Sequence, residues 1–226
     1  AFAAFTAVLG GVVLQVAPGR SDLAAATVSA AVNVGITGGA LVAGPLAQGE
    51  QLKPEYLAIN PHARVPALAT DGGVVTENIA ILNLVADLFG APGSVPRNDP
   101  MAAARCNALL GWFASSVHIS FAQIWRGERF TGDEDLWPAI KQGGIDALEK
   151  QFAEIEQRSG ESGLVDGQFT AADSYLLTFF RWGRRIGMDM SIYLAWAGLN
   201  ERVLERSAVQ RVLEREGLRP EEFEPA

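Results

Sequence analysis

The chain has 226 residues, of which 49% are hydrophobic, which is enough to bury a sizeable core in one large domain or two small ones. The formal net charge is -8 and the 18 basic residues are scattered, so the sequence lacks the basic patch that nucleic-acid binding requires. One cysteine, Cys106, and two histidines, His62 and His118, are too few for a disulfide framework or a usual zinc site. We therefore expect no nucleic-acid partner, no metal and, because one cysteine fits a reducing compartment, a cytoplasmic protein.

The N-terminal segment raises the question of a membrane span, because its first 49 residues carry only two charged side chains. The apolar run 1–16 is shorter than the roughly 20 residues of a spanning helix, has no basic leader and ends in a Pro-Gly turn. We therefore expect no membrane partner, although association of this segment with a membrane surface stays open as an alternative. The pattern favours an apolar extension over residues 1–11 and then a buried strand that ends at Val16.

The residues after this strand predict a β-α-β unit. Asp22 is a suitable N-cap for an Ala-rich helix over residues 23–32, and three glycines then end that helix. Residues 41–46 have the composition of a second strand, parallel to the first. Crossover units of this kind are right-handed almost without exception.

A hairpin and a helix complete the first domain, over residues 12–90. Residues 65–70 and 73–76 flank an Asp-Gly pair, which is typical of two antiparallel strands joined by a tight turn. Apolar residues then recur at helical spacing over 79–88 and predict an amphipathic helix. With the polar stretch that holds residues 54–57 between the second and third strands, the order becomes β-α-β-α-β-β-α.

Residues 91–100 contain three prolines and predict a linker, and no strand periodicity follows it. The second domain, residues 101–226, should therefore be all helix, so the fold class is α/β plus all-α. Thr170 and Asp173 are the first and fourth residues of a capping-box pattern, in which each side chain satisfies a free amide of the first turn. The predicted helices cover residues 101–126, 136–158, 170–186, 196–206 and 208–216.

Five stretches carry a family resemblance that covers residues 12–216: Asn60–Leu68, Thr76–Ile81, Phe169–Leu176, Ala17–Leu23 and Trp112–His118. The first two resemble the segment of the glutathione transferase family that runs from its cis-proline turn to its third helix, and together they are strongly specific. The third resembles the core helix of that family. The last two are similar to the turn and the helix that carry the cysteine and the histidine of the bacterial beta class. The resemblance implies a thioredoxin-like domain followed by a helical bundle.

Ser21 stands where the beta class has its cysteine. A free thiol has a pKa of about 8.5, and lowering it by about two units requires roughly 2.7 kcal/mol of thiolate stabilisation. A hydroxyl at a helix N-terminus is suited to supply much of this, because nearby amides and the helix dipole act in the same direction. The alternative is that Ser21 only caps the helix, and Asp22 is a second candidate for that cap.

The resemblance also implies a glutathione-binding set. The family's proline at Pro66 follows a cis bond, so the backbone of Val65 would pair with the peptide backbone of glutathione. Glu77 and Asn78 open a helix, where free amides attract a carboxylate and Glu77 can accept from an ammonium group. Arg64 completes the set. On its own, a Glu-Asn pair before an apolar helix is more often a simple cap.

In the beta-class interpretation, His118 reaches across the domain interface to the thiol, as a donor or a proton acceptor near neutral pH. The alternative is a buried core histidine, because apolar residues surround it on its helix. Trp112 is a candidate for the electrophile pocket. Cys106 is predicted to be an ordinary buried thiol with no chemistry.

The resemblance implies a detoxifying homodimer that conjugates glutathione, as co-substrate, to small hydrophobic electrophiles. Two departures from the beta class bear on this. Ser21 cannot form a mixed disulfide with glutathione, and Gly111 replaces a polar ligand-binding side chain. The alternative function is therefore a non-catalytic or weakly catalytic binding protein with the transferase fold.

Overall fold

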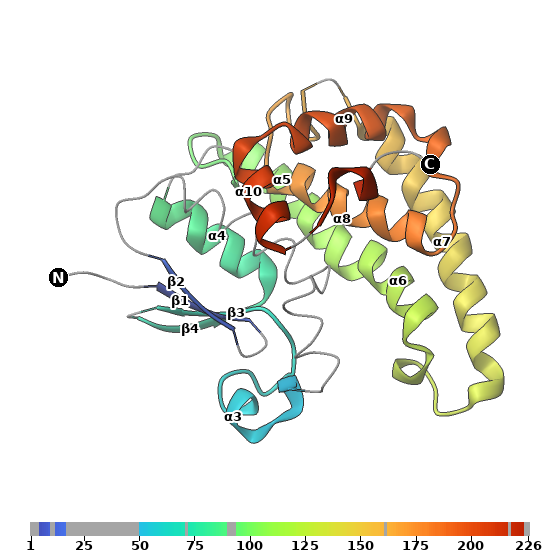
Figure 1. Cartoon of the computed structure of the whole chain (residues 1–226), viewed down its shortest axis with the longest axis horizontal. Coiled ribbons are helices and arrows are strands. Elements are labelled where there is room, and N and C mark those ends of the chain that lie inside the picture. Colours follow the sequence, from blue (N-terminus) through green and yellow to red (C-terminus); the bar gives the residue numbers. More distant parts are fainter. Residues whose placement is uncertain are drawn as a thin grey trace.

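The computed structural model describes residues 5–9, 12–16, 50–70, 72–89, 94–160, 162–216 and 218–223. Figure 1 shows a small sheet with helices beside it at one end of the molecule and a larger group of helices at the other. This arrangement confirms the predicted fold class, a thioredoxin-like part followed by a helical domain. None of the helices in the described ranges is long and apolar enough to cross a membrane.

The sheet has the strand order β2-β1-β3-β4. The predicted hairpin is confirmed, since β3 pairs with β4 in antiparallel fashion and Thr70 lies opposite Gly73. The strands are β1 (Phe5–Leu9), β2 (Val12–Val16), β3 (Ala67–Thr70) and β4 (Gly73–Thr76). The predicted strand that ends at Val16 corresponds to β2.

The segment 1–11, predicted to be an extension, contains β1, and this part of the prediction is wrong. β1 pairs in antiparallel fashion with both β2 and β3, so it lies inside the sheet. A strand is stable only when its backbone groups have hydrogen-bond partners. The apolar composition of residues 5–9 does not show that two neighbouring strands supply those partners. The helix predicted over 23–32 and the strand predicted over 41–46 lie outside the described residues.

Helix α4 (Asn78–Phe89) joins the two parts of the molecule. It contacts β3 and β4 on one side and α5 (Pro100–Trp112) on the other, and Figure 1 shows it between the sheet and the helical domain. Its predicted apolar face is confirmed at Leu82 and Val85, which are buried, whereas Leu88 at the end of the helix is exposed. The short helix α3 (Pro54–Leu57) follows the 3-10 turn η1 (Glu50–Leu52) and buries Tyr56.

All five helices predicted for the second domain are present. Asp99 accepts hydrogen bonds from the amides of Met101 and Ala102, so α5 begins where the proline-rich linker ends. The first predicted helix is continuous but contains a π-helical turn, η2 (Phe113–Val117), before α6 (His118–Trp125). The others are α7 (Trp137–Arg158), α8 (Ala171–Arg185), α9 (Leu194–Leu204) and α10 (Ser207–Glu216). Short 3-10 turns are η3 (Gly127–Arg129), η4 (Glu134–Leu136), η5 (Met190–Ile192) and η6 (Pro220–Phe223).

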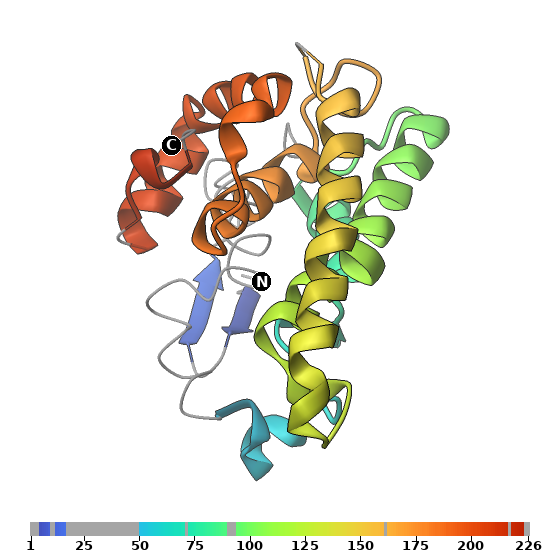
Figure 2. The ribbon, with the colours of Figure 1, turned by 90° about the vertical axis from the view of Figure 1, so that its right-hand side faces the viewer.

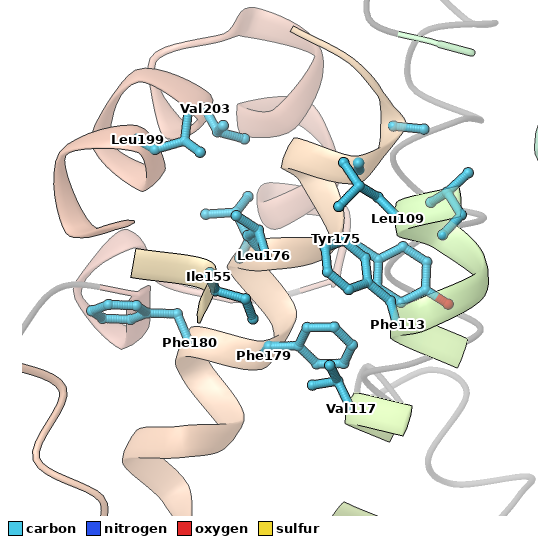
Figure 3. Close-up of a cluster of buried hydrophobic side chains, with 14 of the residues drawn as sticks. Leu109, Phe113, Val117, Ile155, Tyr175, Leu176, Phe179, Phe180, Leu199 and Val203 are labelled. Carbon is cyan, nitrogen blue, oxygen red and sulfur yellow. The ribbon is translucent and has the colours of Figure 1, made fainter. Parts of the chain in front are cut away.

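Helix α8 is the centre of the helical domain, since every residue from Ala171 to Phe180 is buried. Figure 3 shows the rings of Phe113, Tyr175 and Phe179 facing one another, and their centroids are 5.4 to 5.6 Å apart. Each such buried ring contributes about 1.5–3 kcal/mol relative to an exposed one. Cys106 is also fully buried, and burial raises the pKa of its thiol, as expected for a residue without chemistry.

The predicted capping box at the start of α8 is present. The carboxylate of Asp173 accepts from the Thr170 amide at 2.6 Å and from the Thr170 hydroxyl at 3.0 Å. Its other oxygen accepts from the Leu164 amide at 2.8 Å, so this fully buried side chain also holds the loop before the helix. The local pattern predicts the first role, whereas the bond to Leu164 depends on tertiary structure.

Two adjacent glycines of α7 should respond in opposite ways to alanine. A methyl group at Gly143 meets open space, so Gly143→Ala should stabilise the protein by up to about 1 kcal/mol, the difference in helix propensity. A methyl group at Gly144 would lie 2.7 Å from the Ser120 carbonyl oxygen of α6, so Gly144→Ala should cost about 1–3 kcal/mol. Urea unfolding of the two variants checks this, and equal effects would contradict the close packing of α6 on α7 visible in Figure 2.

Candidate functional site

The loop before β3 is fixed by two side chains that bind one carbonyl group. The Tyr56 hydroxyl and the Asn60 side-chain amide both donate to the Arg64 carbonyl oxygen, each at 2.6 Å. Asn60 is 1% exposed, and its Oδ1 accepts from the His62 amide at 3.1 Å. The Val65–Pro66 bond is cis, as the resemblance implied. The loop therefore presents Arg64, which is exposed, and the half-buried Val65 in a defined conformation.

Glu77 lies at the N-terminus of α4 with an exposed carboxylate. Its φ of 69° is in the left-handed region, which is uncommon for a residue with a side chain and which occurs often at ligand sites. Its Oε1 lies 3.9 Å from Nδ1 of His62, and both side chains are largely exposed. An exposed carboxylate therefore lies at a helix N-terminus, where the first amides have no partner within the helix, so this helix end suits a ligand with both an ammonium and a carboxylate group.

Asn78 links the thioredoxin-like part to the helical domain. Its Nδ2 donates to the Tyr175 hydroxyl of α8 at 3.1 Å. Burial raises the pKa of Tyr175 to about 12, so this hydroxyl stays neutral at physiological pH. The Oδ1 atom of Asn78 is buried and has no hydrogen-bond partner within the part of the chain that the structure describes, so it can accept a donor. The side chain thus has both an interdomain role and a free acceptor.

His118 is the first residue of α6, directly after the π-helical turn, and such turns are frequent at functional sites. Its ring lies 5.6 Å from the ring of Trp182 on α8. Burial, together with the positive charges of Arg129 and Arg64, lowers the pKa of His118 to about 4. Because Arg64 belongs to the loop before β3, its charge reaches His118 across the domain interface.

The low pKa of His118 should make the protein sensitive to acid. A histidine of pKa about 4 in the folded protein and about 6.5 when unfolded binds more protons when unfolded, so stability falls as the pH falls from 6.5 through 4. We expect a slope approaching 1.4 kcal/mol per pH unit in that window. His118→Gln should reduce the slope of the free energy of unfolding against pH in this window. Near pH 7.5 the slopes of the two proteins should be the same. Urea unfolding between pH 4 and 8 measures it, and an unchanged slope in the variant would contradict the burial argument.

The aromatic ring beside His118 is Trp182, which the sequence analysis did not single out. Trp182 also contacts Phe121 and Trp125 of α6, with centroids 5.1 and 5.0 Å away. Trp112 instead lies beside Phe113 and under the guanidinium group of Arg158, at 5.9 Å. Trp182 lies three residues after Phe179, so the helical spacing indicates that both are on the same face of α8. The contact of that face with α6 cannot be predicted from one sequence.

The structure thus groups Arg64, Val65, Pro66, Glu77 and Asn78 on one side of the domain interface, with His118 on the other. Ser21 lies outside the described residues. Within the described ranges no three His, Cys, Asp or Glu side chains are grouped as metal ligands. A Cβ atom added at Gly111 would have no neighbouring atom within 4 Å, so no described residue occupies the space beside this glycine.

Comparison with known proteins shows the family of the chain. Residues 42–87 match the model of the glutathione S-transferase N-terminal domain. A glutathione S-transferase of Escherichia coli O157:H7 is 30% identical over 175 residues, which cover 73% of this chain and 80% of the relative. One of Xanthomonas campestris is 27% identical over 166 residues, or 73% of this chain and 81% of the relative.

Solved structures agree. A glutathione transferase homologue of Sulfitobacter with bound glutathione is 26% identical, with a TM-score of 0.69 and coverage of 88% of this chain and 94% of the other. A glutathione S-transferase of Xylella fastidiosa has the same identity and TM-score, with coverage of 88% and 95%. The chain therefore belongs to the glutathione S-transferase family.

Proposed function

We propose that the protein conjugates the thiolate of glutathione to small hydrophobic electrophiles, with Ser21 stabilising the thiolate and His118 assisting. The observation that carries this proposal is the exposed Glu77 carboxylate at the N-terminus of α4, beside the ordered loop that ends at Pro66. The two ends of this site match the γ-glutamyl group and the peptide backbone of glutathione. The Sulfitobacter homologue, which is similar in fold and sequence, binds glutathione.

Each described residue has a distinct task in this proposal. Glu77 accepts from the γ-glutamyl ammonium, while the first amides of α4 and Asn78 take up the γ-glutamyl carboxylate. The backbone of Val65 pairs with the cysteinyl backbone of glutathione. Arg64 contributes a positive charge for the remaining carboxylate, that of the glycine.

His118 acts as a neutral hydrogen-bond donor to the thiolate. A base whose conjugate acid has a pKa of about 4 cannot hold a proton from a thiol of pKa about 8.5. Stabilisation of the thiolate by a neutral N–H group, together with the Ser21 hydroxyl, is therefore the consistent role. The electrophile would lie against Trp112, which is half-buried beside Phe113, and Trp182 is a second candidate because its ring contacts that of His118.

The remaining features follow the family. We propose a cytoplasmic homodimer with a detoxifying role, and light scattering of the purified protein at micromolar concentration tests the dimer. A mass of one chain would contradict it. The specific alternative is a glutathione-binding protein with little turnover, which the serine at position 21 and the open space at Gly111 favour.

Ser21→Ala tests the function. We expect the parent protein to bind glutathione in calorimetry and to turn over an aromatic halide. The variant should lose roughly 10- to 100-fold in turnover at pH 6.5, because it lacks much of the two pKa units of thiolate stabilisation. Ser162→Ala, an exposed serine in the loop before α8, is the control and should be unchanged. Binding without turnover in the parent protein would favour the alternative, and no binding at millimolar glutathione would contradict both.

A further inference from the structure

Helix α9 carries two fully enclosed polar side chains, Trp196 and Asn200, which are 0% and 1% exposed. The indole Nε1 of Trp196 and both side-chain amide atoms of Asn200 are buried without a hydrogen-bond partner among the described residues. Leaving one buried polar group unpaired costs about 1–3 kcal/mol. Three unpaired atoms on one helix therefore require an explanation other than packing.

The two side chains lie on the same face of α9, because residues four apart on a helix are neighbours. Helical side chains lean towards the N-terminus, so the amide of Asn200 leans towards the indole of Trp196. Figure 3 shows Leu199 and Val203 of the same helix on its packed side, above Leu176 and Phe180.

Neither side chain is free to turn towards solvent. The Trp196 ring meets Phe152 and Phe180 edge to face, with centroids 4.9 and 5.3 Å away. Its backbone amide donates to Glu156 of α7 at 2.9 Å, and the amide of Ala195 donates to the same carboxylate at 2.8 Å. The start of α9 is thus fixed to α7, and the indole N–H group has to find its partner inside the domain.

We propose that one water molecule is bound between Trp196 and Asn200 inside the helical domain. The unpaired atoms are two donor nitrogens, Trp196 Nε1 and Asn200 Nδ2, and one carbonyl acceptor, Asn200 Oδ1. A water molecule has two acceptor sites for the Trp196 and Asn200 donors and a hydrogen for Asn200 Oδ1, so a single molecule matches all three. Buried waters typically make about three hydrogen bonds to groups that would otherwise be unpaired.

This site is separate from the proposed glutathione site, and its role is to fix α9 against α7 and α8. A larger ligand does not fit the observation, because aromatic rings enclose Trp196. An anion would leave Asn200 Oδ1 without a donor, and a cation would oppose both N–H groups.

A crystal structure of the full chain at 1.5 Å or better tests the proposal directly. We expect one ordered water within hydrogen-bonding distance of Trp196 Nε1 and of the Asn200 amide. In solution, the indole Nε1 proton of Trp196, assigned with Trp196→Phe, should show a cross-relaxation peak to a long-lived water. Asn200 paired with a backbone group and no water at Trp196 would overturn the proposal.

A double-mutant cycle gives a second readout. Trp196→Phe and Asn200→Leu each remove one side of the water site, so their effects on the unfolding equilibrium constant should be non-additive by about fivefold. Trp196→Phe paired with Asn98→Leu, an exposed position before α5, is the matched control and should be additive. Additivity in the test pair would contradict a shared water, and the crystal measurement does not depend on whether the variants fold.

Discussion

Asp173→Ala is expected to lower the free energy of unfolding by about 4 kcal/mol, a larger loss than that of an ordinary helix cap. The fully buried Asp173 carboxylate satisfies the amides of Thr170 and Leu164, and both would be left without a partner. Each unpaired buried donor costs about 1–3 kcal/mol, and an uncapped helix adds to this. For a chain of this size the melting temperature should fall by roughly 10 °C.

Asp99→Ala is the matched control. Asp99 caps α5 through the amides of Met101 and Ala102, but it is exposed, so water replaces the lost bonds and the cost should be about 1 kcal/mol. The loss in the free energy of unfolding for Asp173→Asn should lie between those of the two alanine variants, since one of the two backbone amides would then face an NH2 group. Circular dichroism during thermal unfolding measures all three. Equal losses for Asp173→Ala and Asp99→Ala would show that burial of the cap does not matter.

Glu77→Gln is expected to weaken glutathione binding by roughly 10- to 100-fold, the loss of one charge-assisted hydrogen bond to an ammonium group. The side chain is 64% exposed and lies at the end of a helix, so the fold should be retained. Turnover at saturating glutathione should change much less than the dissociation constant, because Glu77 contacts the end of glutathione remote from the thiol.

Calorimetric titration with glutathione measures the effect, and Glu214→Gln on α10 is the control, an exposed glutamate at a different face. His62→Ala separates two explanations, because His62 is the group within 3.9 Å of the Glu77 carboxylate. If Glu77 acts through the ligand, His62→Ala should change affinity little. Unchanged affinity in Glu77→Gln would remove this residue from the site and leave the proposed orientation of glutathione without support.

Elements whose signals are local can be predicted from the amino-acid sequence. The hairpin of β3 and β4, the amphipathic face of α4, the five helices of the second domain and the Thr170–Asp173 capping box follow from turn residues, apolar spacing and side chains within four positions. The glutathione-binding set and the cis bond at Pro66 came from the resemblance that the motif carries.

Which elements contact one another depends on the tertiary structure. Three features join residues that are distant in the sequence. They are the pairing of β1, within the predicted extension, with β3, the hydrogen bond of Asn78 to Tyr175 and the contact of Trp182 with His118. The low pKa of His118 depends on burial and on Arg64 from the other domain. A single sequence records which residues are apolar or charged, but pairing between distant segments depends on packing of the whole chain, and so do the desolvation and charge effects that set the chemistry of the site.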